Sequence, residues 1–245
     1  MPVVSASVAL VRFRSEPQQA ALLLDVDGTL APIVERPEEA AVPEETRAEV
    51  ARLAARYVLV ACVSGRESAD ARRLVGLDGI EYIGVHGLEG DPNAERFTAQ
   101  LEEFAESTDW PWTVENKAGV TLTFHYREAS DEVDARRRAD EVARAAEAAG
   151  LATHHGRKVL EVRPPVQADK GTAVRRLLAG RPITRALYAG DDTTDLDAFR
   201  GLDEAGLDVA LKVAIASPET NPALLTRADI VVAGPGELLS FLKTL

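Results

Sequence analysis

The sequence lacks the features that mark several large classes of protein. It has a single cysteine, so an intrachain disulfide is excluded and a cysteine-based zinc site is not expected. That residue, Cys62, lies in the apolar run 58–63, which predicts a thiol buried in a strand. No apolar run approaches the length needed to span a bilayer, and residues 1–12 lack the basic start of a secretory signal. These absences predict a soluble, cytoplasmic protein.

Positive charge is also scarce. The 28 Lys and Arg residues are outnumbered by 40 Asp and Glu residues, which gives a formal net charge of −12. Nucleic acid and anionic membranes attract basic surfaces, so neither is expected as a partner. Aromatic residues make up only 5 % of the chain, so Ala, Val and Leu must fill the core. That composition is typical of strands buried on both faces beneath Ala-rich helices.

Short apolar runs alternate with amphipathic stretches in two separate parts of the chain. In the first part, strands are predicted at 21–25, 57–63 and 80–85, with helices at 43–56 and 67–75 between them. The second part predicts, in order, a helix, a strand, a helix, two strands and a helix, at 170–178, 186–189, 195–200, 208–213, 230–232 and 237–242. This alternation is typical of a parallel sheet.

The region between these parts has a different pattern. Two hairpins, at 112–126 and 151–162, flank a strong helix at 131–149. Hairpin, helix and hairpin predict a small α+β module at 92–165. The sequence therefore predicts a discontinuous α/β core, at 1–91 and 166–245, that is interrupted by this module.

The segment 23–30 ends an apolar strand in two carboxylates. Asp25 and Asp27 lie two residues apart, so an extended backbone places both side chains on one side. Ligands in an open α/β sheet bind outside the carboxyl ends of the strands. Gly28 and Thr29 allow a sharp turn whose N–H groups face an anion, and a divalent cation can offset the repulsion between Asp and phosphate. On this segment alone, an ordinary strand-to-turn signal explains the residues equally well.

A second acidic cluster follows the strand predicted at 186–189. Asp191, Asp192 and Asp195 lie there, and so many carboxylates at one strand end suit a hard cation such as Mg²⁺. An ordinary helix start, with Thr194 as its cap, is the alternative.

Two further segments offer groups that suit a phosphate. Ser64, Gly65 and Arg66 directly follow the second predicted strand and provide a hydroxyl group and a positive charge. Lys170 follows Asp169 at a predicted helix start, where the helix dipole disfavours a cation. That position favours a function for Lys170, with a solvated lysine as the alternative.

Taken in order, these four segments resemble the four motifs of the haloacid dehalogenase-like phosphatase superfamily. The resemblance implies a Rossmann-like α/β core with an inserted α+β cap domain. It assigns Asp25 as the nucleophile and Asp27 as the general acid and base, with Ser64 and Lys170 holding the phosphoryl oxygens. The Mg²⁺ site that it implies consists of Asp25, the Asp27 backbone carbonyl and Asp191, supported by Asp192 and Asp195.

A narrower resemblance covers about residues 21–200 and includes both predicted domains. Its segments are similar to those of the trehalose-6-phosphate phosphatase family, and they are 25–33, 85–89, 115–117, 125–127, 161–164, 169–171, 190–195 and 197–199. The resemblance implies hydrolysis of trehalose 6-phosphate to trehalose and phosphate through an aspartyl-phosphate, the last step of trehalose biosynthesis. It also implies a trehalose-phosphate synthase as a functional partner.

The same resemblance implies a set of substrate-binding residues. In the core they are Gly28, Thr29, Gly65, Arg66 and His86, and in the cap they are Glu115, Lys117, Arg127, Arg157 and Glu161. Alternate residues of a strand share one face, so Glu115 and Lys117 can offer hydrogen bonds to sugar hydroxyls, with His125 and Arg127 on the neighbouring strand. From spacing alone, a charged outer sheet face with cross-strand ion pairs is the favoured explanation.

Three positions depart from the family pattern. Val85 replaces Asn or another polar residue and would affect a sugar contact, Arg157 replaces Lys, and Leu196 replaces an acid. None of them is a phosphoryl-transfer residue.

Three other functions are alternatives. The first is a phosphatase of the same superfamily acting on sucrose 6-phosphate, mannosyl-3-phosphoglycerate or a hexose phosphate, against which the cap segments argue. The second is a non-catalytic, phosphatase-like partner of a synthase, which would lack an acid of the first motif or Lys170. The third, a nucleotide-binding enzyme, is not expected because no Gly-rich loop follows the first strand.

Overall fold

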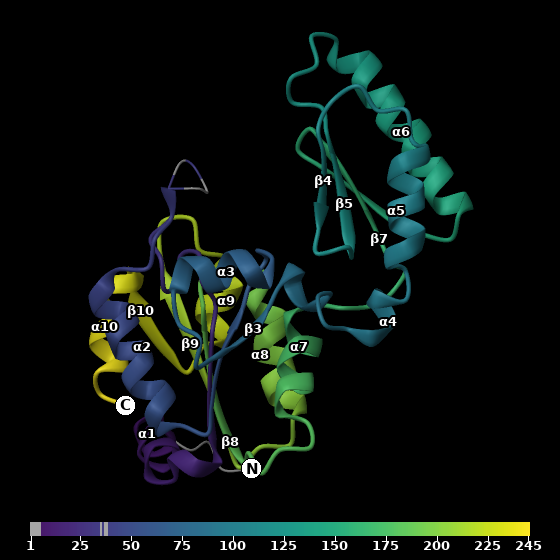
Figure 1. Ribbon diagram of the computed structural model, residues 1–245. Coiled ribbons are helices and arrows are strands. Elements are labelled where there is room, and N and C mark those ends of the chain that lie inside the picture. The colour runs from purple at the N-terminus through teal and green to yellow at the C-terminus, as the bar shows by residue number, and fades with distance from the viewer. Residues whose placement is uncertain (1–5, 35, 37–38) are drawn as a thin grey trace. The chain divides into compact units, whose positions relative to one another are not determined.

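The computed structural model of the chain describes residues 6–34, 36 and 39–245 (Figure 1). The chain forms two compact units, the first made of Met1–Gly87 and Ala168–Leu245 and the second of Leu88–Gln167. The domain boundaries expected from the sequence, at 91/92 and 165/166, lie within a few residues of these. Positions 1–5, 35, 37 and 38 of the expected first domain lie outside the described residues.

The first unit is built on a six-stranded sheet whose described neighbours are all parallel. The strand order is β10-β9-β8-β1-β2-β3. The strands are β1 (Ala20–Leu24), β2 (Leu59–Val63), β3 (Glu81–Ile83), β8 (Arg185–Gly190), β9 (Val209–Ala216) and β10 (Ile230–Ala233). The parallel sheet predicted from the strand–helix alternation is therefore confirmed, and β1 lies inside it between β2 and β8.

Helices cover both faces of this sheet (Figure 1). Leu22 and Leu24 of β1 face one hydrophobic cluster, and Leu23 faces the other, because alternate strand residues point to opposite faces. The first face is covered by α1 (Ala6–Ser15), α2 (Glu44–Arg56), α3 (Ser68–Val75) and α10 (Gly234–Leu242). The second face is covered by α7 (Lys170–Leu178), α8 (Asp195–Glu204) and α9 (Pro222–Arg227). Among the described residues, no helix combines the length and the apolar character that crossing a bilayer requires.

The second unit is an antiparallel sheet with helices packed on one face. The strand order is β4-β5-β7-β6, with β4 (Val114–Lys117), β5 (Thr121–His125), β6 (Ala152–Gly156) and β7 (Val159–Arg163). Leu122 and Phe124 of β5 face the helices α5 (Thr98–Ser107) and α6 (Glu132–Ala148). The α6 helix begins after Asp131, whose side chain accepts a hydrogen bond from the N–H of Asp134.

Four α-helices of the described residues were not predicted from the sequence. They are α1, α4 (Pro92–Glu95), α5 and α9. In α1 only Phe13 is buried, and Val8 and Val11 are more than half exposed, so its apolar periodicity is weak. Two strand ends differ from those predicted. β4 begins two residues later than expected, and β5 ends at His125 rather than at residue 126.

Candidate active site

Three neighbouring strands of the parallel sheet end at side chains that the sequence singled out. Asp25 follows β1, Ser64 follows β2, and Asp191 follows β8. Because these strands are adjacent and parallel, their carboxyl ends meet at one edge of the sheet. Asp25 is 5 % exposed and Ser64 is 1 % exposed, so both lie almost out of solvent. The topology thus brings together residues that lie far apart in the sequence.

Lys170 is a buried cation at the start of α7. The preceding Asp169 accepts a hydrogen bond from the N–H of Thr172, whose hydroxyl accepts one from the Asp169 N–H, and this capping box fixes the helix start. Lys170 Nζ lies 3.0 Å from Asp25 Oδ2 and 2.7 Å from Asp195 Oδ1. Burial alone would lower the pKa of Lys170, but the two carboxylates outweigh it and raise the pKa. They also offset the unfavourable helix dipole, so Lys170 is held charged.

Carboxylate oxygens of Asp25, Asp191 and Asp195 converge within 4.8 Å of one another. Burial raises the pKa of Asp25, with a further contribution from the other two carboxylates, and Lys170 opposes this rise. Burial and the charge of Asp195 raise the pKa of Asp191 to about 6. Mutual repulsion in a partly buried cluster of oxygen ligands is what a bound hard cation relieves. The residues therefore fit a metal ion.

The carboxylate of Asp27 does not join this cluster. It faces Arg66 instead, which donates two hydrogen bonds to it, from Nε at 2.7 Å and from Nη2 at 2.8 Å. A further hydrogen bond of this guanidinium group goes from Nη1 to Asp70, also at 2.7 Å. Arg66 was expected to bind the substrate. In the structure its guanidinium group instead binds Asp27, the expected general acid and base. Coordination by the Asp27 backbone carbonyl stays a prediction.

The turn after β1 is shaped by its contact with Asp191. Gly28 has φ +73°, and a Cβ atom there would lie 2.0 Å from Asp191 Oδ2. Only glycine combines this backbone angle with this space. The fully buried Thr29 donates a hydrogen bond from Oγ1 to Asp191 Oδ1 at 3.2 Å. Both residues were expected at the substrate, and both contact an expected metal ligand.

A strained turn supports the segment that carries Ser64. Val85 and His86 have φ +49° and +53°, which non-glycine residues seldom adopt. Their N–H groups donate to the carbonyls of Arg66 and Ser64, both at 2.9 Å. The His86 ring lies so close to Gly65 that a Cβ there would be 2.6 Å from it. Val85 is only 4 % exposed, so its departure from the family pattern acts on this buried turn rather than on an exposed contact.

Sequence reasoning missed one polar residue of this site, Tyr188 of β8. Its hydroxyl donates to Asp195 Oδ1 at 2.7 Å, and Asp195 Oδ2 accepts a hydrogen bond from the Asp192 N–H at 2.8 Å. Asp192 was expected to support the metal site; in the structure its backbone N–H contacts Asp195, and its role at a metal stays a prediction. Thr194 occupies the N-cap position of α8, but its side chain makes no cap hydrogen bond. The signal for Tyr188 was a hydroxyl inside an apolar strand, three residues before an acidic cluster.

In the second unit, several expected sugar-binding residues share the sheet face opposite the helices. Thr123 of β5 pairs with Glu115 of β4 and with Glu161 of β7. Glu115 accepts a hydrogen bond from His125 at 3.1 Å and lies 3.8 Å from Lys117. Thr123 is 3 % exposed, and its buried hydroxyl has no partner among the described residues.

The two expected arginines of this set lie outside the strands. Arg127 comes two residues after β5 ends, so the strand alternation expected to pair it with His125 does not reach it. Arg157 lies in the turn between β6 and β7. Both are exposed.

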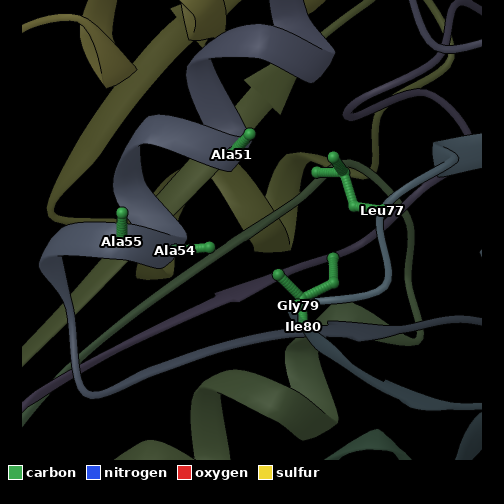
Figure 2. A pocket seen from close by; sticks show the side chains of 6 residues that line it. All are labelled: Ala51, Ala54, Ala55, Leu77, Gly79 and Ile80. Carbon is green, nitrogen blue, oxygen red and sulfur yellow. The ribbon is translucent and has the colours of Figure 1, made fainter.

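The first unit also has an apolar hollow of about 280 Å³ away from these residues. Figure 2 shows Ala51, Ala54 and Ala55 of α2 on one side of it, and Leu77, Gly79 and Ile80 on the other. These six lining residues have no charged or hydroxyl group. The hollow therefore lacks the means for the chemistry that the carboxylates suggest.

Known proteins share this sequence pattern. A family model described as trehalose-phosphatase matches residues 23–223. A probable trehalose-phosphate phosphatase G of Arabidopsis thaliana is 32 % identical, over 100 % of this chain and 73 % of the relative. A trehalose-phosphate phosphatase of Mycobacterium marinum is 35 % identical, over 78 % of this chain and 54 % of the relative. The chain thus spans about three quarters of one relative and about half of the other.

Solved structures share the fold. A trehalose-6-phosphate phosphatase related protein has a TM-score of 0.66 at 28 % identity, over 91 % of this chain and 96 % of the other. A haloacid dehalogenase-like hydrolase from Bacteroides thetaiotaomicron has a TM-score of 0.65 at 14 % identity, over 93 % of this chain and 99 % of the other. At that identity the second likeness shows the fold alone, which is the expected haloacid dehalogenase-like α/β fold.

Proposed function

The chain belongs to the trehalose-phosphatase family, and from that premise we propose that it hydrolyses trehalose 6-phosphate to trehalose and inorganic phosphate. It is then a phosphoric monoester hydrolase that completes trehalose biosynthesis. One observation carries the proposal: Lys170 Nζ bridges Asp25 and Asp195 at the sheet edge where Asp191 converges on them. A buried cation beside a buried carboxylate is the arrangement that phosphoryl transfer to that carboxylate needs.

In the first half of the reaction, a carboxylate oxygen of Asp25 attacks phosphorus and the bond from phosphorus to the sugar oxygen breaks. The products are an aspartyl-phosphate and a sugar alkoxide that takes a proton from the carboxyl group of Asp27. Lys170 and the Ser64 hydroxyl hold the phosphoryl oxygens. Lys170 already lies 3.0 Å from the attacking group, which supports this role.

In the second half, Asp27 accepts a proton from a water molecule that attacks the aspartyl-phosphate. This step frees inorganic phosphate, restores the Asp25 carboxylate and returns Asp27 to its protonated form. The ion pair between Asp27 and Arg66 supports a role for Arg66 in orienting the Asp27 carboxylate, since two parallel hydrogen bonds fix the plane of that group.

We assign the cofactor as Mg²⁺, held by Asp25, Asp191 and the backbone carbonyl of Asp27, with Asp192 and Asp195 in support. When bound, the ion supplies positive charge that offsets the repulsion between the Asp25 carboxylate and the phosphate dianion. The convergence of three carboxylates whose charges repel one another supports this assignment. The oxygen-only ligand set favours Mg²⁺ over softer metals.

We further propose that the cap is the second unit and that its polar sheet face binds sugar hydroxyls, through Glu115, Lys117 and Glu161. The Thr123 hydroxyl between Glu115 and Glu161 supports this, because it has no hydrogen-bond partner in the described part of the chain and a buried polar group without a partner is costly unless a ligand meets it. The outlying positions of Arg127 and Arg157 make them the weaker candidates of the set. In the core, Gly65 and His86 are proposed to bound the phosphate end.

The deciding experiment is phosphate release from trehalose 6-phosphate, compared with glucose 6-phosphate and sucrose 6-phosphate, with Mg²⁺ and in chelator. We expect a kcat/KM for trehalose 6-phosphate at least about a hundredfold above the others, since two to three unmet hydrogen bonds cost that much. Faster release from sucrose 6-phosphate or mannosyl-3-phosphoglycerate would assign the chain to another sugar phosphate. No release from any substrate would favour a non-catalytic partner of a synthase.

This function has two corollaries. It makes a trehalose-phosphate synthase the functional partner, because that enzyme supplies the substrate, and co-purification of the two full-length chains tests physical association. A cytoplasmic location stays a prediction, to be checked by imaging the tagged full-length chain.

A further inference from the structure

Asp195 is the point at which three segments of the active site meet. Its side chain is fully buried. Oδ1 accepts hydrogen bonds from Lys170 Nζ and from the Tyr188 hydroxyl, both at 2.7 Å, and Oδ2 accepts the Asp192 N–H at 2.8 Å. These bonds occupy three of roughly four acceptor positions of the carboxylate. A Cβ atom on Gly190 would lie 2.2 Å from the Asp195 Cγ, so the neighbouring strand is packed tightly against it.

Packing alone does not require the hydroxyl group of Tyr188. The side chain is fully buried on β8, and its ring lies 6.2 Å from that of Phe199 in an edge-to-face contact. A phenylalanine would fill the same volume and keep this contact. A buried hydroxyl is costly unless it is hydrogen-bonded, and its partner here is the carboxylate that also holds Lys170.

The same carboxylate has two competing uses. One oxygen of Asp195 lies within 4.8 Å of oxygens of both Asp25 and Asp191, near enough to share a cation with them. The oxygen that receives Tyr188 is the one that receives Lys170, so the hydroxyl fixes Asp195 in the orientation that serves Lys170. Without that bond, Asp195 would be freer to turn toward a cation.

We propose that Tyr188 is a positioning residue for phosphoryl transfer. Its hydroxyl holds Asp195 as the anchor of Lys170 and keeps it from acting as a metal ligand, so that Lys170 stays directed at Asp25. The inference rests on the proposed function in that it takes Asp25 as the nucleophile. It adds a residue to the machinery and divides the three carboxylates into two roles, with Asp25 and Asp191 for the metal and Asp195 for the lysine.

The test is Tyr188→Phe, matched by Tyr57→Phe. Tyr57 is also a buried tyrosine of the first unit, and its hydroxyl donates to the backbone carbonyl of Leu245 at 3.3 Å. Each change removes one buried hydroxyl and keeps the ring, so we expect both variants to stay folded, with the larger loss of thermal stability in Tyr188→Phe because its partner is charged. Only Tyr188→Phe should lower kcat, by about tenfold or more, which is the usual effect of losing a hydrogen bond to a charged group.

Mg²⁺ binding to the purified protein, measured by titration calorimetry, supplies a readout that does not depend on turnover. We expect Tyr188→Phe to bind Mg²⁺ as tightly as wild type or a few-fold more tightly, because Asp195 is freed, while kcat falls. A kcat loss with a parallel loss of Mg²⁺ affinity would overturn the inference and make Tyr188 a support of the metal site. An unchanged kcat would also overturn it.

A second pair of variants keeps the result specific to Asp195. In an Asp195→Asn background, the further change Tyr188→Phe should have little effect on kcat, because the two residues act as one unit. If Tyr188→Phe lowers kcat by the same factor in the Asp195→Asn background as in wild type, the inference is contradicted.

Turnover is followed with p-nitrophenyl phosphate as well as with trehalose 6-phosphate. If wild type hydrolyses p-nitrophenyl phosphate but not trehalose 6-phosphate, the proposed substrate is wrong. The role of Tyr188 is then still tested by the kcat for p-nitrophenyl phosphate. If wild type hydrolyses neither substrate, there is no phosphoryl transfer for Tyr188 to position, and the inference is overturned together with the proposed function.

Discussion

Arg66 holds the carboxylate of Asp27 in two parallel hydrogen bonds of 2.7 and 2.8 Å, from a position 39 residues further along the chain. The same guanidinium group reaches Asp70 on α3. It therefore ties the group proposed as general acid and base to a helix that begins four residues after Ser64. The plane and direction of the Asp27 carboxylate are set before any substrate arrives.

Arg66→Lys should lower kcat by about tenfold, because an ammonium group keeps the charge but cannot make two parallel hydrogen bonds. KM should change less. Steady-state kinetics test this, with Arg73→Lys as the matched control, since Arg73 pairs with Asp70 at an exposed position. A wild-type kcat in the Arg66→Lys enzyme would show that the aim of Asp27 does not depend on this pair.

Asp25→Asn should abolish turnover, with a fall of roughly a thousandfold or more, because the amide cannot form the covalent intermediate. The protein should remain folded, since the two groups are nearly the same size and one charge leaves a repelling cluster. Phosphate release and circular dichroism measure the two effects. Asp78→Asn, whose side chain is 98 % exposed, is the control. Appreciable activity of pure Asp25→Asn would refute the assignment.

The stability of the metal-free protein should depend on Asp191 and on pH. Its pKa is raised to about 6 from 3.8, so its stabilising contribution is full below the lower value and is lost as the pH rises through the upper one. Asp191→Asn should therefore raise the free energy of unfolding in chelator near pH 7.5 by about 1 kcal/mol, a figure reduced for partial solvent screening.

Mg²⁺ should reverse this order, stabilising wild type more than the variant. Urea denaturation at about pH 5 and pH 7.5, with and without Mg²⁺, measures both effects. Lower metal-free stability of Asp191→Asn at the higher pH would contradict the account.

Ala118→Gly should stabilise the protein by about 0.5–1 kcal/mol. Ala118 is exposed and has φ +51° in the turn between β4 and β5, a conformation that glycine adopts without strain. The same substitution at Ala145, exposed within α6, should instead cost about 1 kcal/mol. Denaturant unfolding of both variants compares them, and the same sign at both sites would exclude backbone strain as the cause.

Glu161→Ala and Lys117→Ala should separate sugar binding from chemistry. Loss of a charged hydrogen-bond partner should lower kcat/KM for trehalose 6-phosphate by roughly a hundredfold. Hydrolysis of p-nitrophenyl phosphate, which has no sugar, should change little. Glu141→Ala on the exposed face of α6 is the control. Equal losses on both substrates would assign the residues to folding, and no loss on either would leave the sheet face merely solvated.

The elements around the site were predictable from sequence because each rests on local signals. The apolar run before Asp25, the capped start at Lys170 and the acidic cluster after β8 each combine a periodicity with a turn or a cap. Parallel pairing then dictates that these ends meet. The helix α5 was missed because only Leu101 is buried in it, which leaves too little periodicity to detect.

The partners of individual side chains were not predictable, because they depend on where each side chain points in the folded structure. Nothing local distinguishes an Arg66 that binds phosphate from one that binds Asp27. Likewise, the pattern of β8 shows that Tyr188 is buried but does not show where its hydroxyl points. The positive φ of Val85 has no local signal at all, since valine disfavours it, and it depends on hydrogen bonds to the carbonyls of Arg66 and Ser64.

The place of β1 between β2 and β8 has a consequence for synthesis on the ribosome. One edge of β1 pairs with β2, made soon afterwards, but its other edge must wait for β8, which emerges only after the whole of Leu88–Gln167. The second unit is continuous in sequence and can fold while the first is still half a sheet. During that interval the strand that leads into Asp25 has an apolar, unpaired edge, the kind of surface on which nascent chains aggregate and chaperones act.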